Sequence, residues 1–131
     1  MLATWERHWD EHGFGLLAVE DRETRELIGR SGVQYHRLWP ADPEVGWAFD
    51  PDWWGRGLAT EAGAASVGWA FRELALPRVV SIAHPENVAS RRVMEKLGFE
   101  VVAERHSDVW GRLLVHALDR PAQAGAFPNR S

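Results

Sequence analysis

The sequence of 131 residues contains no cysteine and a single lysine, Lys96. Without cysteine the chain has no disulfides, no thiolate metal site and no cysteine nucleophile. A net charge of −4 and the lack of a Lys/Arg-rich face argue against general nucleic-acid binding. No apolar run approaches membrane-spanning length, and residues 1–6 lack the cationic and apolar regions of a signal peptide. These absences predict a cytoplasmic protein that binds neither nucleic acid nor a membrane.

At 45% hydrophobic residues, the chain can bury one core. We therefore expect a single domain over residues 1–120. The tail over residues 121–131 is rich in Pro, Gly, Ala and Asn, which predicts disorder.

Periodicity and turn residues predict the order of the elements. We expect helices over residues 4–12, 59–74 and 87–97, strands over 14–20, 26–35, 44–49 and 78–84, and a closing hairpin of 99–105 with 109–119. Residues 21–25 and 39–43 are predicted to be a turn and a loop. Leu58, Ala62, Ala65 and Trp69 form one stripe of the longest helix. This order is typical of an α+β fold with a mixed sheet.

A glycine-bearing loop runs into this longest helix, at Trp53 to Ala62. Because Gly55 and Gly57 have no Cβ, a phosphate could approach bare N–H groups at the helix N-terminus. The loop matches neither the GxxxxGK[ST] nor the GxGxxG nucleotide motif, and a plain turn before a helix is the alternative interpretation. The loop is thus a candidate phosphate site.

A second segment, Asn87 to Phe99, has the signals of a complete short helix. Asn87 suits the N-cap, Lys96 the last turn and Gly98 the position after the C-terminus. Together the two segments resemble the GNAT superfamily of acyl-CoA-dependent N-acetyltransferases. Its cofactor loop [QR]-x-x-G-x-[GA] matches Trp54 to Ala59, with Trp54 in the place of Gln or Arg, and its second motif, N-x-x-[AS] followed by G-F, matches Asn87 to Phe99. With Glu44-Val45-Gly46-Trp47 added, the pattern is similar to the RimJ/RimL-like branch.

The resemblance covers about residues 14–119 and implies a fold and a cosubstrate. The fold is a mixed, mainly antiparallel sheet flanked by helices, in which the strand with Glu44 and the strand ending at His84 splay apart. Acetyl-CoA would enter this gap, and no metal is expected. The residues that would hold it are Trp54, Gly55, Arg56, Gly57, Leu58, Ala59, Thr60, Asn87 and Ser90.

The resemblance implies an N-terminal strand and helix ahead of residues 4–12 that this sequence does not show, so we expect either that the sequence starts inside a longer protein or that a second copy covers the exposed edge. The strand over residues 14–20 would then be an apolar edge that invites pairing with another chain. We therefore expect self-association, for example a homodimer.

Acyl transfer to an amine needs a proton acceptor, since free amines with pKa values of about 8 to 10 are mostly charged at neutral pH. The resemblance places Glu44 near the reacting centre, although a solvated glutamate at a strand edge is an equally ordinary alternative. His84, at the end of its strand, is a second candidate base, with a structural histidine as its alternative. His36, His106 and His116 lie in separate strands without metal-binding spacing.

The proton for the leaving thiolate has no obvious donor. Many superfamily members have a tyrosine where this chain has Met94, and methionine cannot donate a proton. Ser90 or water would have to serve. Two functions therefore remain: an N-acetyltransferase that acts by direct transfer in a ternary complex, and a CoA-binding module with little turnover. The acceptor, a protein N-terminus or a small-molecule amine, is left open.

Overall fold

The computed structural model describes residues 13–122. The helix expected over residues 4–12 and the tail beyond Ala122 lie outside this range. Within it, no helix is long and apolar enough to cross a membrane.

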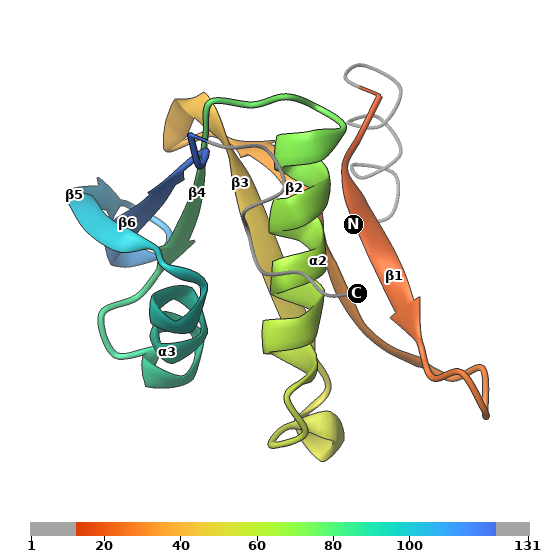
Figure 1. The fold of residues 1–131 in the computed structure, drawn as a ribbon. Coiled ribbons are helices and arrows are strands. Elements are labelled where there is room, and N and C mark those ends of the chain that lie inside the picture. The colour runs from red at the N-terminus through yellow and green to blue at the C-terminus, as the bar shows by residue number, and fades with distance from the viewer. Residues whose placement is uncertain (1–12, 123–131) are drawn as a thin grey trace.

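Among residues 13–122, six strands form one sheet in the order β1-β2-β3-β4-β6-β5, and two α-helices lie beside it (Figure 1). The pairing of β3 with β4 is parallel, and the other four pairings are antiparallel. This arrangement confirms the predicted α+β fold. The elements in chain order are β1 (Leu16–Glu20), β2 (Leu27–His36), β3 (Trp39–Phe49), the 3-10 turn η1 (Pro51–Trp53), α2 (Leu58–Arg72), β4 (Arg78–Ala83), α3 (Val88–Leu97), β5 (Glu100–Ser107) and β6 (Gly111–Asp119).

Both ends of α3 are fixed by the residues that the sequence suggested. The Asn87 side chain accepts a hydrogen bond from the Ser90 N–H at 3.2 Å, which satisfies one free donor of the first turn. Gly98 has φ 100°, a left-handed conformation, and its N–H bonds back to the carbonyls of Glu95 and Met94. The helix therefore starts and stops where local chemistry dictates.

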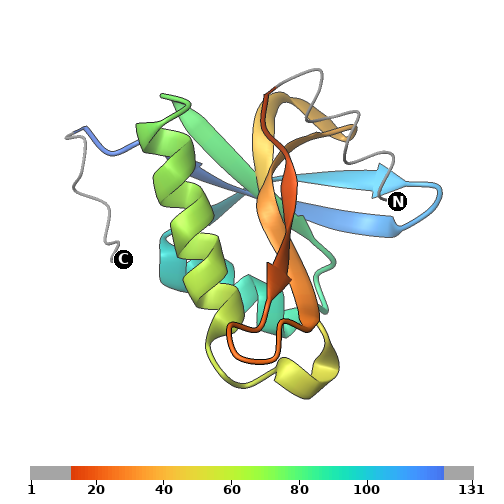
Figure 2. The ribbon, with the colours of Figure 1, turned by 90° about the vertical axis from the view of Figure 1, so that its right-hand side faces the viewer.

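Both helices cover the same face of the sheet (Figures 1 and 2). We call this side the helix face; its core joins Val45 and Val79 of the sheet to Val67 and Phe71 of α2 and Met94 of α3. On the opposite face, a smaller cluster consists of Val80, Val115 and Ala117, with Trp39, Ile82 and Ala103 packed against it.

The long helix is confirmed, and Trp69 of its predicted stripe packs against the core, but the stripe is not the most buried side of α2. Ala65 is exposed, and Leu58, Ala62 and Trp69 are only half-buried. The buried residues are Gly63, Val67, Gly68, Ala70 and Phe71. Val67 and Phe71 of this set belong to the core of the helix face, and Gly63 allows the close approach, since a Cβ there would lie 3.1 Å from the Trp47 ring.

The loop predicted over residues 39–43 is also wrong, because β3 already begins at Trp39. Pro43, which has no N–H to donate, is tolerated because it is paired with no residue of β2 or β4. A register shift between Gln34 and His36 accommodates the start of this hairpin.

The strand β1 lies at one edge of the sheet, so self-association through it stays a prediction. Leu17 on this strand is 57% exposed. We expect Leu17→Lys to reduce dimer or aggregate formation in light scattering at micromolar concentration, because charge on an edge opposes strand pairing. Val109→Lys, the same change at an exposed residue after β5, is the matched control. A stable monomer of the unmodified chain would dismiss the idea.

Candidate active site

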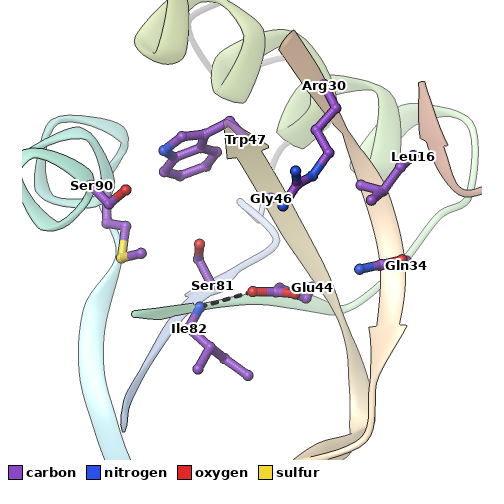
Figure 3. A pocket seen from close by; sticks show the side chains of 10 residues that line it. Leu16, Arg30, Gln34, Glu44, Gly46, Trp47, Ser81, Ile82 and Ser90 are labelled. Carbon is purple, nitrogen blue, oxygen red and sulfur yellow. Dashed lines mark hydrogen bonds between the residues drawn. The ribbon is translucent and has the colours of Figure 1, made fainter. Parts of the chain in front are cut away.

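The parallel strands β3 and β4 separate within the sheet. In the described part of the chain, their backbone pairing consists of one residue pair, Glu44 with Val80, although both strands continue beyond it. A cavity of about 170 Å³ lies at this opening (Figure 3). Its lining residues are Leu16, Arg30, Gln34, Glu44, Gly46, Trp47, Ser81, Ile82, Ser90 and Met94.

The cavity has lining residues from both faces of the sheet. Side chains alternate between faces along a strand, and Glu44 is paired with Val80 of the opposite-face cluster. The β2–β3 register places Arg30 and Gln34 on that same face. Trp47 and Met94, in contrast, belong to the core of the helix face. The lining of the cavity therefore includes side chains of both faces at the gap between the two strands.

Glu44 is the ionisable group at the centre of this opening. It is only 9% exposed, and its Oε2 accepts a hydrogen bond from the Ile82 N–H at 3.2 Å (Figure 3). Burial raises the pKa of Glu44 to about 7, against the lowering effects of the Ile82 hydrogen bond and the Arg30 charge. The alternative of a solvated strand-edge glutamate is therefore wrong. A buried carboxylate that titrates near neutrality suits a general base.

Two further predicted site residues belong to this region: Ser90 lies on α3, and Asn87 lies at its start. Ser90 lines the cavity, although its backbone N–H is engaged by the Asn87 cap. Met94, at the position of the family's tyrosine, is 2% exposed and also lines the cavity. Asn87 itself is exposed. A hydroxyl at residue 90 thus remains available to the cavity.

His84 is not brought to the cavity. It follows β4 directly, is exposed, and is absent from the lining residues. Its main-chain carbonyl accepts a hydrogen bond from the Asn87 N–H at 3.0 Å, which shapes the turn into α3. A role of His84 as a base stays a prediction.

The predicted phosphate loop has the geometry of an open helix N-terminus. Gly55 and Gly57 adopt φ 79° and 77°, left-handed values that favour glycine. Gly57 is the N-cap of α2, and no side chain of the described residues caps this end. The first backbone bond of the helix is donated by Glu61 to the Gly57 carbonyl. The N–H groups of Leu58, Ala59 and Thr60 are therefore directed out of the helix, as anion binding requires.

The aromatic residues of this loop fix its shape. The Trp54 indole Nε1 donates to the Phe49 carbonyl at 2.7 Å, at the end of β3. Arg56 lies 4.4 Å over the Trp53 ring and donates to the Asp52 carbonyl. The Trp54 side chain remains 67% exposed. The loop is therefore tied to the strand that carries Glu44.

Sequence reasoning missed Arg30, Gln34 and Ser81. Gln34 lies between Val33 and Tyr35, the ordinary pattern of a strand with one solvated face, and Arg30 lies between Gly29 and Ser31, where no pattern marks it. Ser81 interrupts the apolar run Val79 to Ala83, and this interruption was the one available signal.

Comparison with known proteins gives a family match and many structural matches. The model of the acetyltransferase (GNAT) domain matches residues 1–100. YoaA of Bacillus subtilis, described as an uncharacterized N-acetyltransferase, is 35% identical over 104 residues, which are 76% of this chain and 56% of YoaA. The chain thus spans about half the length of the curated relatives it matches.

Two solved structures show the same fold. A putative GnaT-family acetyltransferase from Bordetella pertussis superposes with a TM-score of 0.81 at 29% identity, covering 88% of this chain and 72% of that one. A ribosomal-protein-S5-alanine acetyltransferase from Vibrio fischeri has a TM-score of 0.76 at 21% identity, covering 92% and 69%. The second likeness concerns the fold alone.

Proposed function

Since this chain belongs to the GNAT acetyltransferase family, we propose that it transfers an acetyl group from acetyl-CoA to a primary amine, directly in a ternary complex. The observation that carries the proposal is the buried carboxylate of Glu44, set where a cavity joins the two faces of the sheet. The chain has no cysteine to form a thioester intermediate, which agrees with direct transfer.

Acetyl-CoA fits the helix face. Its pyrophosphate would be bound by the outward N–H groups at the start of α2, where the helix dipole also favours negative charge. A Cβ at Gly55 or Gly57 would meet no atom within 4 Å, so the loop leaves space for a ligand. The acyl-bearing arm would enter the opening along a path lined by Trp47, Ser81, Ser90 and Met94.

The amine would approach from the opposite face. There Glu44 accepts its proton, directly or through water, because a carboxylate with a pKa of about 7 is largely ionised at slightly alkaline pH. The leaving thiolate would take a proton from Ser90 or from water, since Met94 has none to give.

The acceptor itself is only partly constrained. The branch motifs are similar to those of the RimJ/RimL-like enzymes, so a protein N-terminus and a small-molecule amine both remain candidates. Cytoplasmic location likewise stays a prediction.

The charge of Arg30 makes a prediction about pH dependence. Arg30 lowers the pKa of Glu44, so Arg30→Gln should move the acid limb of the kcat/KM profile to higher pH. Arg37→Gln is the control. Arg37 is exposed at the turn after β2, so this substitution removes the same charge at a place away from the cavity. An unmoved limb in Arg30→Gln would show that Glu44 does not set it.

The second candidate function is a CoA-binding module with little turnover, and Met94 in the cavity favours it. The two are separated by measuring free-thiol release from acetyl-CoA with a panel of amines: α-amino peptides, amino acids, a polyamine and an aminoglycoside. We expect amine-dependent thiol release with at least one class. CoA binding in calorimetry without release from any of them would favour the module.

A further inference from the structure

At the opening between β3 and β4, two hydrogen bonds that involve side chains replace one backbone hydrogen bond of the ladder. After the pair Glu44 with Val80, the next rung of a regular parallel ladder would join the Ile82 N–H to the Val45 carbonyl. Instead, the Val45 carbonyl accepts a hydrogen bond from the Ser81 Oγ at 2.9 Å, and the Ile82 N–H donates to the Glu44 carboxylate at 3.2 Å. Each backbone group of the missing rung thus has a side-chain partner.

The Ser81 bond is buried and the Glu44 bond is part-buried, so the loss of either partner is costly. Ser81 is 2% exposed, Val45 is fully buried, and Glu44 is 9% exposed. A buried backbone group without a partner is costly, so the strands can stay apart at this point only if both groups are satisfied. If Ser81 lost its hydroxyl, the Val45 carbonyl would need another donor, and the Ile82 N–H is the one that the regular ladder would supply.

We propose that Ser81 is a positioning residue that keeps the acyl path open and holds the Ile82 N–H available for Glu44. The hydroxyl of Ser81 occupies the Val45 carbonyl and so prevents the next rung from closing. Without this hydroxyl, the Ile82 N–H bonds to the Val45 carbonyl, so the gap between the strands narrows by one backbone hydrogen bond. Glu44 then loses the Ile82 N–H as its hydrogen-bond donor. This role rests on the proposed acetyl transfer for its consequence in catalysis, but the exchange of partners itself can be measured without activity.

The surroundings of Glu44 define what else could affect its titration. Arg30 of β2 is the charged group that acts on it among the described residues, and Gln34 of the same strand does not titrate. The cavity-lining groups of α3, at Ser90 and Met94, do not titrate near neutrality either. A change at Ser81 therefore reaches Glu44 through the Ile82 hydrogen bond and leaves its charged neighbour in place.

The chain offers a matched control in Ser31. This serine is also buried, at 6% exposure, and its Oγ donates to a β3 carbonyl, that of Gly46, at 3.1 Å. It lies on β2, however, where the strands are continuously paired, and not across the opening. Ser31→Ala removes this hydrogen bond, and a second one at 3.2 Å between Ser31 Oγ and Ser66 Oγ, without altering the partners of Val45 or Ile82.

The main test compares Ser81→Val with Ser81→Thr, two side chains of similar shape of which only threonine keeps the hydroxyl. The Ile82 amide nitrogen and proton shifts are followed by NMR through a pH titration, together with calorimetry of CoA binding. In the unmodified chain and in Ser81→Thr, the Ile82 signal should titrate with Glu44. In Ser81→Val, it should lose this titration, and CoA binding should weaken about fivefold, the effect of one buried hydrogen bond.

Kinetics supply the second arm. We expect Ser81→Val to raise the KM for acetyl-CoA and to move the acid limb of kcat/KM to higher pH, because Glu44 loses the hydrogen bond that lowers its pKa. Ser31→Ala should change neither. If Ser81→Val lowers only thermal stability, with Ile82 still titrating and CoA affinity unchanged, Ser81 is merely structural. Ser81→Ala replaces Ser81→Val if valine prevents folding, with the same expected results.

The two proposals fail in different ways. An unmodified chain that releases no thiol with any amine overturns acetyl transfer, while the Ile82 titration still decides the role of Ser81. An active chain in which Ser81→Val and Ser31→Ala behave alike overturns the role of Ser81 and leaves acetyl transfer standing.

Discussion

Glu44→Gln should lower kcat/KM for the amine by about 10²-fold while CoA affinity remains nearly unchanged. The amide has the shape of the carboxylate, and its oxygen can still accept the Ile82 hydrogen bond, so the opening between β3 and β4 is preserved. What the variant loses is the ability to take a proton. Steady-state kinetics and calorimetry of CoA binding measure the two quantities separately.

The same substitution should change the pH profile. In the unmodified chain, we expect kcat/KM to rise with pH as Glu44 ionises near its pKa of about 7. The limb belonging to Glu44 should vanish in Glu44→Gln, which leaves only the ionisation of the amine. A limb that persists unchanged in Glu44→Gln but disappears in His84→Ala would assign the base to His84 instead.

Stability should move in the opposite direction from activity. The folded-state pKa of Glu44 lies above the unfolded value of 4.5, so the folded protein binds more protons between these values and loses stability as pH rises from about 4.5 to 7. At pH 8, Glu44→Gln should therefore be more stable than the unmodified chain, by on the order of 3 kcal/mol. The difference should shrink below pH 5. Denaturant unfolding at the two pH values measures it, and equal stability at pH 8 would contradict the raised pKa.

The sequence predicted the fold well wherever local chemistry decides the structure. The Asn87 cap, the Gly98 end and the Gly57 helix start are local features, and each stands where the pattern placed it. The errors arose where tertiary contacts decide. The buried side of α2 depends on Val67 and Phe71 meeting the sheet, and the early start of β3 depends on pairing with β2, which no local window contains.

The candidate site was predictable in part for the same reason. The family motifs pointed to Glu44 and to a candidate phosphate loop that stays a prediction, but the burial that raises the pKa of Glu44 results from packing across several strands. The role of Ser81 depends on one missing rung of the ladder, and a sequence pattern records no such gap. His84 shows the converse: it follows the correct strand, yet its side chain is exposed.

Gly57→Asp should weaken acetyl-CoA binding by well over tenfold, or about 1.4 kcal/mol or more. The aspartate carboxylate would lie at the start of α2, where it can accept hydrogen bonds from the same N–H groups that we expect to hold the pyrophosphate. It would also place a negative charge beside the phosphates. Because aspartate is a good N-cap residue, the helix itself should still form.

Two controls separate the charge from the backbone conformation. Gly57→Asn has almost the same size and tolerates left-handed φ values, but carries no charge, so it should weaken binding less than Gly57→Asp. Gly111, at the start of β6, has the same φ of 77° as Gly57 and lies in equally open space. Gly111→Asp should therefore lower the stability of the fold about as much as Gly57→Asp does, but leave CoA affinity unchanged. If calorimetry finds equal CoA affinity in a folded Gly57→Asp variant, the phosphates are bound elsewhere, and the loop is only a turn that starts a helix.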